Sequence, residues 1–131
     1  MRPIYYQLTL EERPGYLRAK VVGERTRENA LRFLEEAYSA CVMSGHSALL
    51  LEMGFSGPSL DTMSVLEVIS QRAPDGMKLR KIAYVEPSAA DADPAMPYFA
   101  EQAAINRGVN VRLFQSVDAA AAWLSDKRDI S

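Results

Sequence analysis

The side chains best suited to chemistry are scarce in this sequence. Cys41 is the only cysteine and His46 is the only histidine. A single cysteine forms neither an internal disulfide nor a cysteine-based metal site, and acid–base relays usually recruit several such groups. Cys41 also falls on the apolar face of a predicted helix, which favours a small buried residue over a reactive thiol. These counts argue against metallocatalysis and against a Ser-His-Asp triad, so we predict no metal and no cofactor.

Two glutamates offer the one arrangement that resembles an acid–base centre. Glu52 and Glu86 both fall at the ends of predicted central strands, where they could face each other across a crevice. Paired carboxylates serve acid–base chemistry when their environments separate their pKa values. No third group is evident to activate a nucleophile, and solvated charges at strand ends are the favoured interpretation. We therefore predict that the protein is not an enzyme.

The segment GFSGPS, residues 54–59, is the strongest candidate for a binding site. It follows a predicted parallel strand, and ligands gather beyond the carboxyl ends of such strands. Its glycines let the backbone approach a phosphate or carboxylate, which the N–H groups of the next helix would bind. Alternatively, Ser56 or Ser59 is phosphorylated, or one of them only caps the helix. The predicted ligand- or partner-binding residues are Gly54, Phe55, Ser56, Gly57, Ser59, Glu86 and Ser88, with Ser56 and Ser59 as the phosphorylation candidates.

Hydrophobic periodicity predicts the elements that position these residues. Residues 4–10 and 17–21 alternate between apolar and polar side chains on either side of a Pro-Gly turn, which predicts an antiparallel hairpin. Thr26 is placed to cap a helix whose apolar residues recur at three-to-four spacing until a glycine ends it. The continuous apolar run ALLLEM, residues 48–53, predicts a central parallel strand that is covered on both faces.

The second half of the chain continues to alternate helices with strands. The predicted elements are a helix over residues 60–73, a strand over 79–85, a helix from about Asp93 to Gly108, an edge strand over 109–113 and a last short helix capped by Ser116. Pro58 is expected in the first turn of the first of these helices, and Pro94 or Pro97 in that of the next. The irregular segment 87–97 suits a lid or partner-contact loop, or a solvated connection.

The resulting order is ββαβαβαβα, an α/β fold in a single layered domain over residues 1–131. Strands that alternate with helices predict a mostly parallel five-stranded sheet with an antiparallel N-terminal hairpin strand and four helices.

Charge and hydropathy exclude two broad classes of partner. Fifteen Lys and Arg residues stand against 17 Asp and Glu residues without a run of either sign, which argues against nucleic acid. No apolar stretch approaches the roughly 18–20 residues that cross a bilayer. The N-terminus lacks the pattern of a signal peptide, so we expect a cytoplasmic protein. Tyr5, Tyr6 and Tyr16 mark a candidate self-association surface on the hairpin, which would make a homodimer.

Taken together, these patterns resemble a SpoIIAA-like domain of the sulfate transporter and anti-sigma-factor antagonist (STAS) group. The resemblance rests on the opening hairpin, on LLLEM followed by a small-residue loop and a helix, on KIAYV, and on the ending VNVRLFQSVDAAAAWL. That ending, with its capping Ser116, resembles a bacterial branch of the group most closely. The resemblance implies a non-enzymatic module whose strands are ordered sequentially and whose helices lie mainly on one side of the sheet.

The resemblance also implies a mode of regulation. Members of the signalling branch bind an anti-sigma kinase and are switched by phosphorylation of a serine at the start of the second helix. Ser56 and Ser59 fall in that neighbourhood, although the Asp-Ser-Ser/Thr-Gly pattern of that branch is absent.

Two functions follow from these observations. The first is a regulatory or protein-interaction module of the STAS-like kind, which binds a protein partner through the loop and helix after the third strand. The second is a carrier or sensor of an apolar or acyl small molecule, held in a pocket between the second and third helices. The residues predicted to line that pocket are Met63, Met96, Tyr98 and Phe99.

Overall fold

The computed structural model describes residues 6–86 and 92–126, and its strands form one five-stranded sheet in the order β1-β2-β3-β4-β5. β1 and β2 are antiparallel, and every later neighbouring pair is parallel. The strands are β1 (Tyr6–Arg13), β2 (Tyr16–Glu24), β3 (Ala48–Ser56), β4 (Lys81–Val85) and β5 (Val111–Phe114). The helices in the described part of the chain are α1 (Arg27–Met43), α2 (Thr62–Gly76), α3 (Met96–Asn106) and α4 (Val117–Leu124). The predicted fold class and element order are confirmed.

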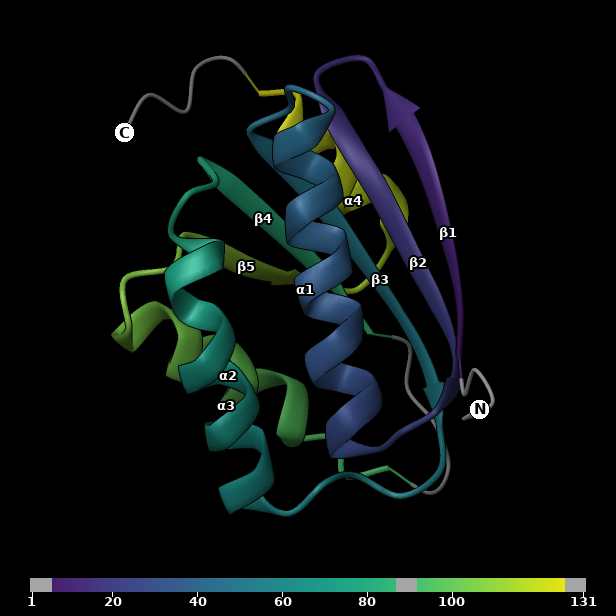
Figure 1. Ribbon diagram of the computed structural model, residues 1–131, viewed down its shortest axis with the longest axis vertical. Helices are drawn as coiled ribbons and strands as arrows, with labels where there is room; N and C mark the ends of the chain where they lie inside the picture. The colour runs from purple at the N-terminus through teal and green to yellow at the C-terminus, as the bar shows by residue number, and fades with distance from the viewer. Residues whose placement is uncertain (1–5, 87–91, 127–131) are drawn as a thin grey trace.

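The helices divide unevenly between the two faces of the sheet. Figure 1 shows α1, α2 and α3 on one face and α4 on the other. Two clusters of buried side chains correspond to these two layers, and Leu49 and Leu51 belong to the first while Leu50 belongs to the second. All three leucines are buried, as predicted for a central parallel strand covered on both faces. The placement of the helices mainly on one side is confirmed as well.

The N-terminal hairpin turns at Gly15, whose φ of 88° lies in the left-handed region that favours glycine. Tyr6 and Tyr16 are both buried, with 7% of their surface exposed, so they do not form the self-association surface predicted for them. The hydroxyl of Tyr6 donates a hydrogen bond to Glu36 of α1, which explains why this tyrosine faces inward. Tyr5 lies outside the described residues.

Two helix caps lie where the sequence predicts them. Thr26 accepts a hydrogen bond from the backbone N–H of Asn29 at 3.0 Å, and Ser116 accepts one from Ala119 at 3.2 Å. Side-chain oxygens at these positions satisfy N–H groups that have no partner within the helix. Because a cap is a local interaction, sequence alone identifies it.

The region after the third strand differs from prediction. β3 continues to Ser56, so Gly54, Phe55 and Ser56 belong to a strand and not to a loop. The cause is the length of β2, whose last three residues pair with these three and hold them extended. A Cβ atom at Gly54 would lie 2.5 Å from the carbonyl oxygen of Val21, so this glycine permits close strand approach and does not mark a turn.

The predicted start of α2 is wrong for the same reason. α2 begins at Thr62 and its cap is Asp61, so neither Ser56 nor Ser59 caps it, and Pro58 precedes the helix instead of occupying its first turn. At its other end α2 includes Pro74 and continues to Gly76.

The later elements begin after their predicted positions. α3 starts at Met96 with Pro97 in its first turn, while the carboxylate of Asp93 accepts a hydrogen bond from the backbone N–H of Ala95 in the preceding turn. β5 starts at Val111, and Val109 is buried but lies outside the strand.

A lysine is buried between the sheet and α4. Lys81 has 1% of its surface exposed, and its Nζ donates to the carbonyl oxygens of Trp123 at 2.8 Å and Asp126 at 3.3 Å. The same Nζ lies 4.8 Å from the centre of the Trp123 ring. Lysine is rarely buried unless its charge is compensated, and the end of α4 supplies that compensation with carbonyl oxygens and an aromatic face. The contacts of Lys81 therefore hold α4 against β4.

Candidate functional site

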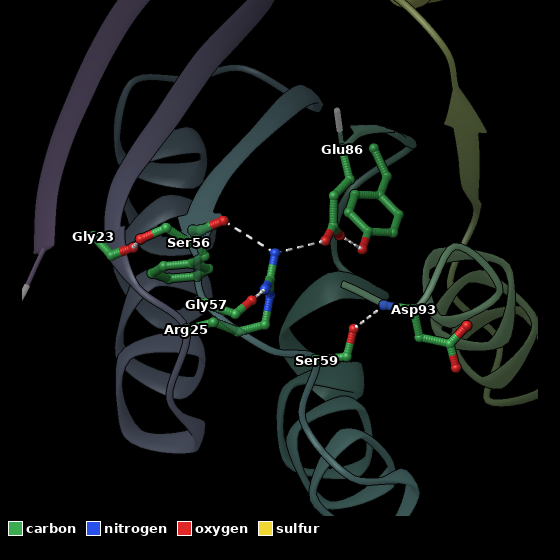
Figure 2. Close-up of polar contacts among 9 residues, drawn as sticks. Gly23, Arg25, Ser56, Gly57, Ser59, Glu86 and Asp93 are labelled. Atoms are coloured by element: carbon green, nitrogen blue, oxygen red, sulfur yellow. Dashed lines mark hydrogen bonds and ion pairs between the residues drawn. The ribbon is translucent and has the colours of Figure 1, made fainter. Parts of the chain in front are cut away.

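The carboxyl ends of β2, β3 and β4 meet at one edge of the sheet because these strands are parallel. Just beyond them lie Arg25, Gly57 and Glu86, which Figure 2 shows close together. In a parallel sheet this is the edge where binding sites usually form. The region predicted to form the site thus lies where three strand ends converge, although the loop itself starts later than predicted.

Arg25 links these three strand ends. Its Nη2 donates to the carbonyl oxygen of Phe55 at 3.0 Å and lies 3.4 Å from Oε2 of Glu86, and its Nη1 donates to the carbonyl oxygen of Gly57. The backbone N–H of Arg25 also donates to the carbonyl oxygen of Ser56 at 2.8 Å. Only 9% of the Arg25 side chain and 16% of the Glu86 side chain are exposed. A charge pair this buried is tolerable because its donors and acceptors are satisfied.

The second oxygen of Glu86 is also occupied. The hydroxyl of Tyr84 donates to Oε1 of Glu86. Burial, and then the neighbouring charge of Glu86, raise the pKa of Tyr84 well above its usual value, which keeps this hydroxyl protonated as a donor. Glu86 therefore acts as an acceptor that holds Arg25 and Tyr84 in place.

The two glutamates considered as an acid–base pair do not face each other. Glu52 alternates with Leu51 along β3 and shares the α4 face with Leu50, whereas Tyr84 and Glu86 lie with Leu51 on the opposite face. Glu52 instead accepts a hydrogen bond from Arg18 at 2.6 Å. Both carboxylates are thus held by arginines, which differs from the solvated charges expected at these positions.

The two candidate serines occupy different environments. Ser56 is exposed, and its hydroxyl donates to the carbonyl oxygen of Gly23 at 3.3 Å. Ser59 is half-buried, and its hydroxyl accepts a hydrogen bond from the backbone N–H of Asp93 at 2.8 Å. The second contact joins the loop before α2 to the segment before α3, as Figure 2 shows.

The remaining predicted site residues contribute mainly backbone. Phe55 directs its ring into the core, where it packs edge-on against Phe33 with 6.1 Å between ring centres, so only its carbonyl reaches Arg25. Gly57 has a φ of 99°, which only glycine adopts without strain. Gly54 lies within β3, and Ser88 is outside the described residues.

The N-terminus of α2 is already capped by the chain itself. The carboxylate of Asp61 accepts hydrogen bonds from the backbone N–H of Ser64 at 2.8 Å and from its hydroxyl at 3.1 Å. These bonds lower the pKa of Asp61. A carboxylate of the same chain thus already binds one of the N–H groups at which an anion was expected, and anion binding at this helix stays a prediction. An Asp immediately before the first helical residue was the available sequence signal for this cap.

The side chains singled out for chemistry lie away from this edge. Cys41 is fully buried, and burial raises the pKa of its thiol to about 11, as fits a core residue. His46 precedes β3 at its other end and lies 3.1 Å from a carboxylate oxygen of Glu12. Within residues 6–86 and 92–126, no three His, Cys, Asp or Glu side chains gather in a way that could hold a metal ion. No helix in this part of the chain is both long and apolar enough to cross a membrane.

A cavity of about 130 Å³ lies on the face of the sheet that α1, α2 and α3 cover. Arg25, Tyr84 and Glu86 form part of its lining. Of the residues predicted to line an apolar pocket, Met96 does so, whereas Met63 and Tyr98 are exposed large hydrophobic side chains and Phe99 is not part of the lining. An apolar pocket is present, but it is lined by side chains that point between the helices and the sheet.

Comparison with known proteins bears on the fold. No family model and no curated protein matches the sequence. Among solved structures, this one is similar to an anti-sigma factor antagonist from Mycobacterium paratuberculosis, with a TM-score of 0.59 and 20% sequence identity. The similarity covers 92% of this chain and 95% of that chain. The protein thus has the fold of the STAS group, and the resemblance seen in the sequence is confirmed at the level of the fold.

Proposed function

We propose that this protein is a regulatory protein-interaction module of the anti-sigma-factor antagonist kind. The observation that carries the proposal is the structural similarity over 92% of the chain to an antagonist of this class. The proposed interaction surface comprises the loop 57–61 and the start of α2, immediately beyond the strand ends that Arg25 joins. We propose no catalytic step, and a protein partner accounts for a site built largely of backbone.

The chemistry of this surface suits a protein partner. Asp61, Thr62 and Met63 are consecutive exposed residues at the start of α2, and Met63 has 66% of its surface exposed. An exposed methionine among polar residues adapts to the contours of a partner, and burying it there removes apolar surface from water. Arg25 holds the adjoining loop through backbone contacts, so the surface is presented in a fixed form.

Ser56 is the better candidate for a phosphorylation switch on this surface. It is exposed, whereas the hydroxyl of Ser59 is already an acceptor for the Asp93 N–H. A phosphoryl group adds between about one and a half and two negative charges at neutral pH. On Ser56 it would lie beside the carbonyl oxygen of Gly23, between the two carbonyl oxygens that Arg25 binds. Modification would therefore alter the loop that the partner contacts.

The test is affinity capture from the native cell with purified variants as bait. We expect the wild-type chain to capture a partner that Met63→Glu loses. Met43→Glu is the matched control, because Met43 is another methionine with 84% of its surface exposed but lies at the end of α1. Ser56→Asp should change the captured set, while Ser39→Asp on the exposed side of α1 should not. Identical capture by wild type, Met63→Glu and Ser56→Asp would rule out this surface.

A further inference from the structure

The cavity is partly open to solvent, and it is large for a gap between a sheet and the helices packed on it. Side chains in protein cores pack about as densely as organic crystals, and voids larger than a water molecule are few. The cavity measures about 130 Å³, close to the volume of an engineered apolar cavity that binds benzene in another protein, about 150 Å³. By size alone, the cavity would therefore hold a molecule with roughly as many heavy atoms as benzene.

The walls of the cavity are apolar and come from several elements. Leu34 of α1, Leu51 of β3 and Val65, Val68 and Ile69 of α2 contribute larger side chains. Alanines on α2 and α3 complete the lining, and their short side chains leave space where a leucine or phenylalanine would fill it. An apolar molecule in this space would replace missing dispersion contacts along the walls.

The lining also contains one unsatisfied donor. Arg72 lines the cavity, and its Nε is buried without a hydrogen-bond partner among the described residues. Its Nη1 is engaged, because this atom lies 3.5 Å from carboxylate oxygens of both Glu35 and Asp75. An unsatisfied buried N–H costs free energy that an acceptor on a ligand would recover.

We propose that this cavity binds a small uncharged molecule of about six to nine heavy atoms with an apolar body and one hydrogen-bond acceptor, as in a phenol. The acceptor receives the Nε–H of Arg72, and the body contacts the leucines and valines of the wall. A neutral ligand is favoured because the lining arginines are already paired, Arg25 with Glu86 and Arg72 with Glu35 and Asp75, and the lining carboxylate of Glu101 accepts the backbone N–H of Leu113.

This inference goes beyond the proposed partner function. α2 supplies both a wall of the cavity and, at its N-terminal end, the proposed interaction surface. A ligand that packs against Val65 and Val68 therefore stabilises the helix that the partner contacts. Small-molecule occupancy and partner binding become coupled through α2, so the module also acts as a sensor.

The test is a titration of the purified full chain with benzene and with phenol, followed by methyl NMR. We expect saturable shifts of the methyl groups of Leu34, Val65 and Val68, while those of Val117 and Leu124 beyond the opposite face of the sheet stay unchanged. Phenol should bind at least about tenfold more tightly than benzene, as one added hydrogen bond to a charged donor provides. The Arg72→Lys variant keeps the cation without Nε, so it should lose this preference and retain its affinity for benzene.

A space-filling variant completes the test. Ala100 lines the cavity and is half-buried, so Ala100→Leu should fold and reduce the affinity for both probes at least tenfold. Absence of saturable shifts with either probe would overturn the proposal. Shifts that spread to Val117 and Leu124, or that persist unchanged in Ala100→Leu, would overturn it as well. A preference for phenol that survives in Arg72→Lys would overturn the role of Nε. Because no partner is present, failure here is distinguishable from failure of the interaction surface.

Discussion

Arg25 and Glu86 are 61 residues apart in sequence, yet their side chains form a largely buried ion pair with 3.4 Å between Nη2 and Oε2. The pair joins the residue after β2 to the residue after β4, and the remaining donors of Arg25 bind the backbone at the end of β3 and just after it. One guanidinium thus fixes the edge of the sheet on which the proposed interaction surface depends.

Removing this guanidinium should be costly. In Arg25→Met, Glu86 loses its counter-charge and two carbonyl oxygens lose a donor, so we expect a loss of roughly 3–5 kcal/mol in the free energy of unfolding. Arg27→Met is the control, because Arg27 pairs with Glu67 on the surface and should contribute about 1 kcal/mol or less. Urea unfolding measures both. Equal losses in the two variants would show that the contacts of Arg25 contribute no more to stability than the surface contacts of Arg27.

The buried thiol of Cys41 should make stability depend on pH in the alkaline range. Burial raises its pKa from 9.0 to about 11, so the unfolded chain releases this proton at lower pH than the folded chain does. The stabilising contribution is complete below pH 9 and is lost as the pH rises towards 11, at roughly 1 kcal/mol per pH unit. Urea unfolding of wild type and Cys41→Ala across this range isolates the effect. Parallel pH profiles for the two proteins would contradict it.

Gly54 should not tolerate a side chain. A Cβ at this position would meet the carbonyl oxygen of Val21 at 2.5 Å, and backbone atoms cannot move aside without disturbing the β2–β3 pairing. We expect Gly54→Ala to lose about 1–3 kcal/mol of stability. Gly45→Asn serves as the comparison, since Gly45 has open space and a positive φ that asparagine accepts. If thermal unfolding showed that Gly54→Ala is no less stable than Gly45→Asn, the close approach of β2 and β3 at Gly54 would be disproved.

Lys81 should hold α4 on the sheet. In Lys81→Met the carbonyl oxygens of Trp123 and Asp126 lose their shared donor, which we expect to cost about 1–3 kcal/mol. The effect should be local: relative to wild type, amide hydrogen exchange should become faster in α4 and stay unchanged in α1. The exposed Lys78 provides the control substitution Lys78→Met. Unchanged exchange in α4 would mean that the helix docks without this lysine.

The sequence predicts best what depends on local patterns. The hairpin, the caps at Thr26 and Ser116 and the buried run of β3 follow from alternation, spacing and side-chain chemistry within a few residues. The same reasoning placed Gly54 in a loop, because the pairing that extends β3 comes from β2, about 30 positions away in the chain. Contacts of this range leave no local signal.

The site shows the same limit. The position of the candidate region at the carboxyl ends of parallel strands was predictable from element order. Arg25 was missed because an arginine after a strand resembles any solvated charge until Glu86, distant in sequence, is placed beside it. Met63 and Tyr98 were predicted to face inward from their helical spacing, but the orientation of α2 and α3 on the sheet decides which face is covered.

The cavity also has a mechanical consequence. Hydrostatic pressure favours the state of smaller volume, and unfolding eliminates voids that the native packing encloses. The part of the cavity beneath α2 that the helices close off from solvent therefore makes the native state yield to compression more readily than a fully packed sheet of the same size. A molecule that filled it would raise the pressure as well as the temperature at which the protein unfolds.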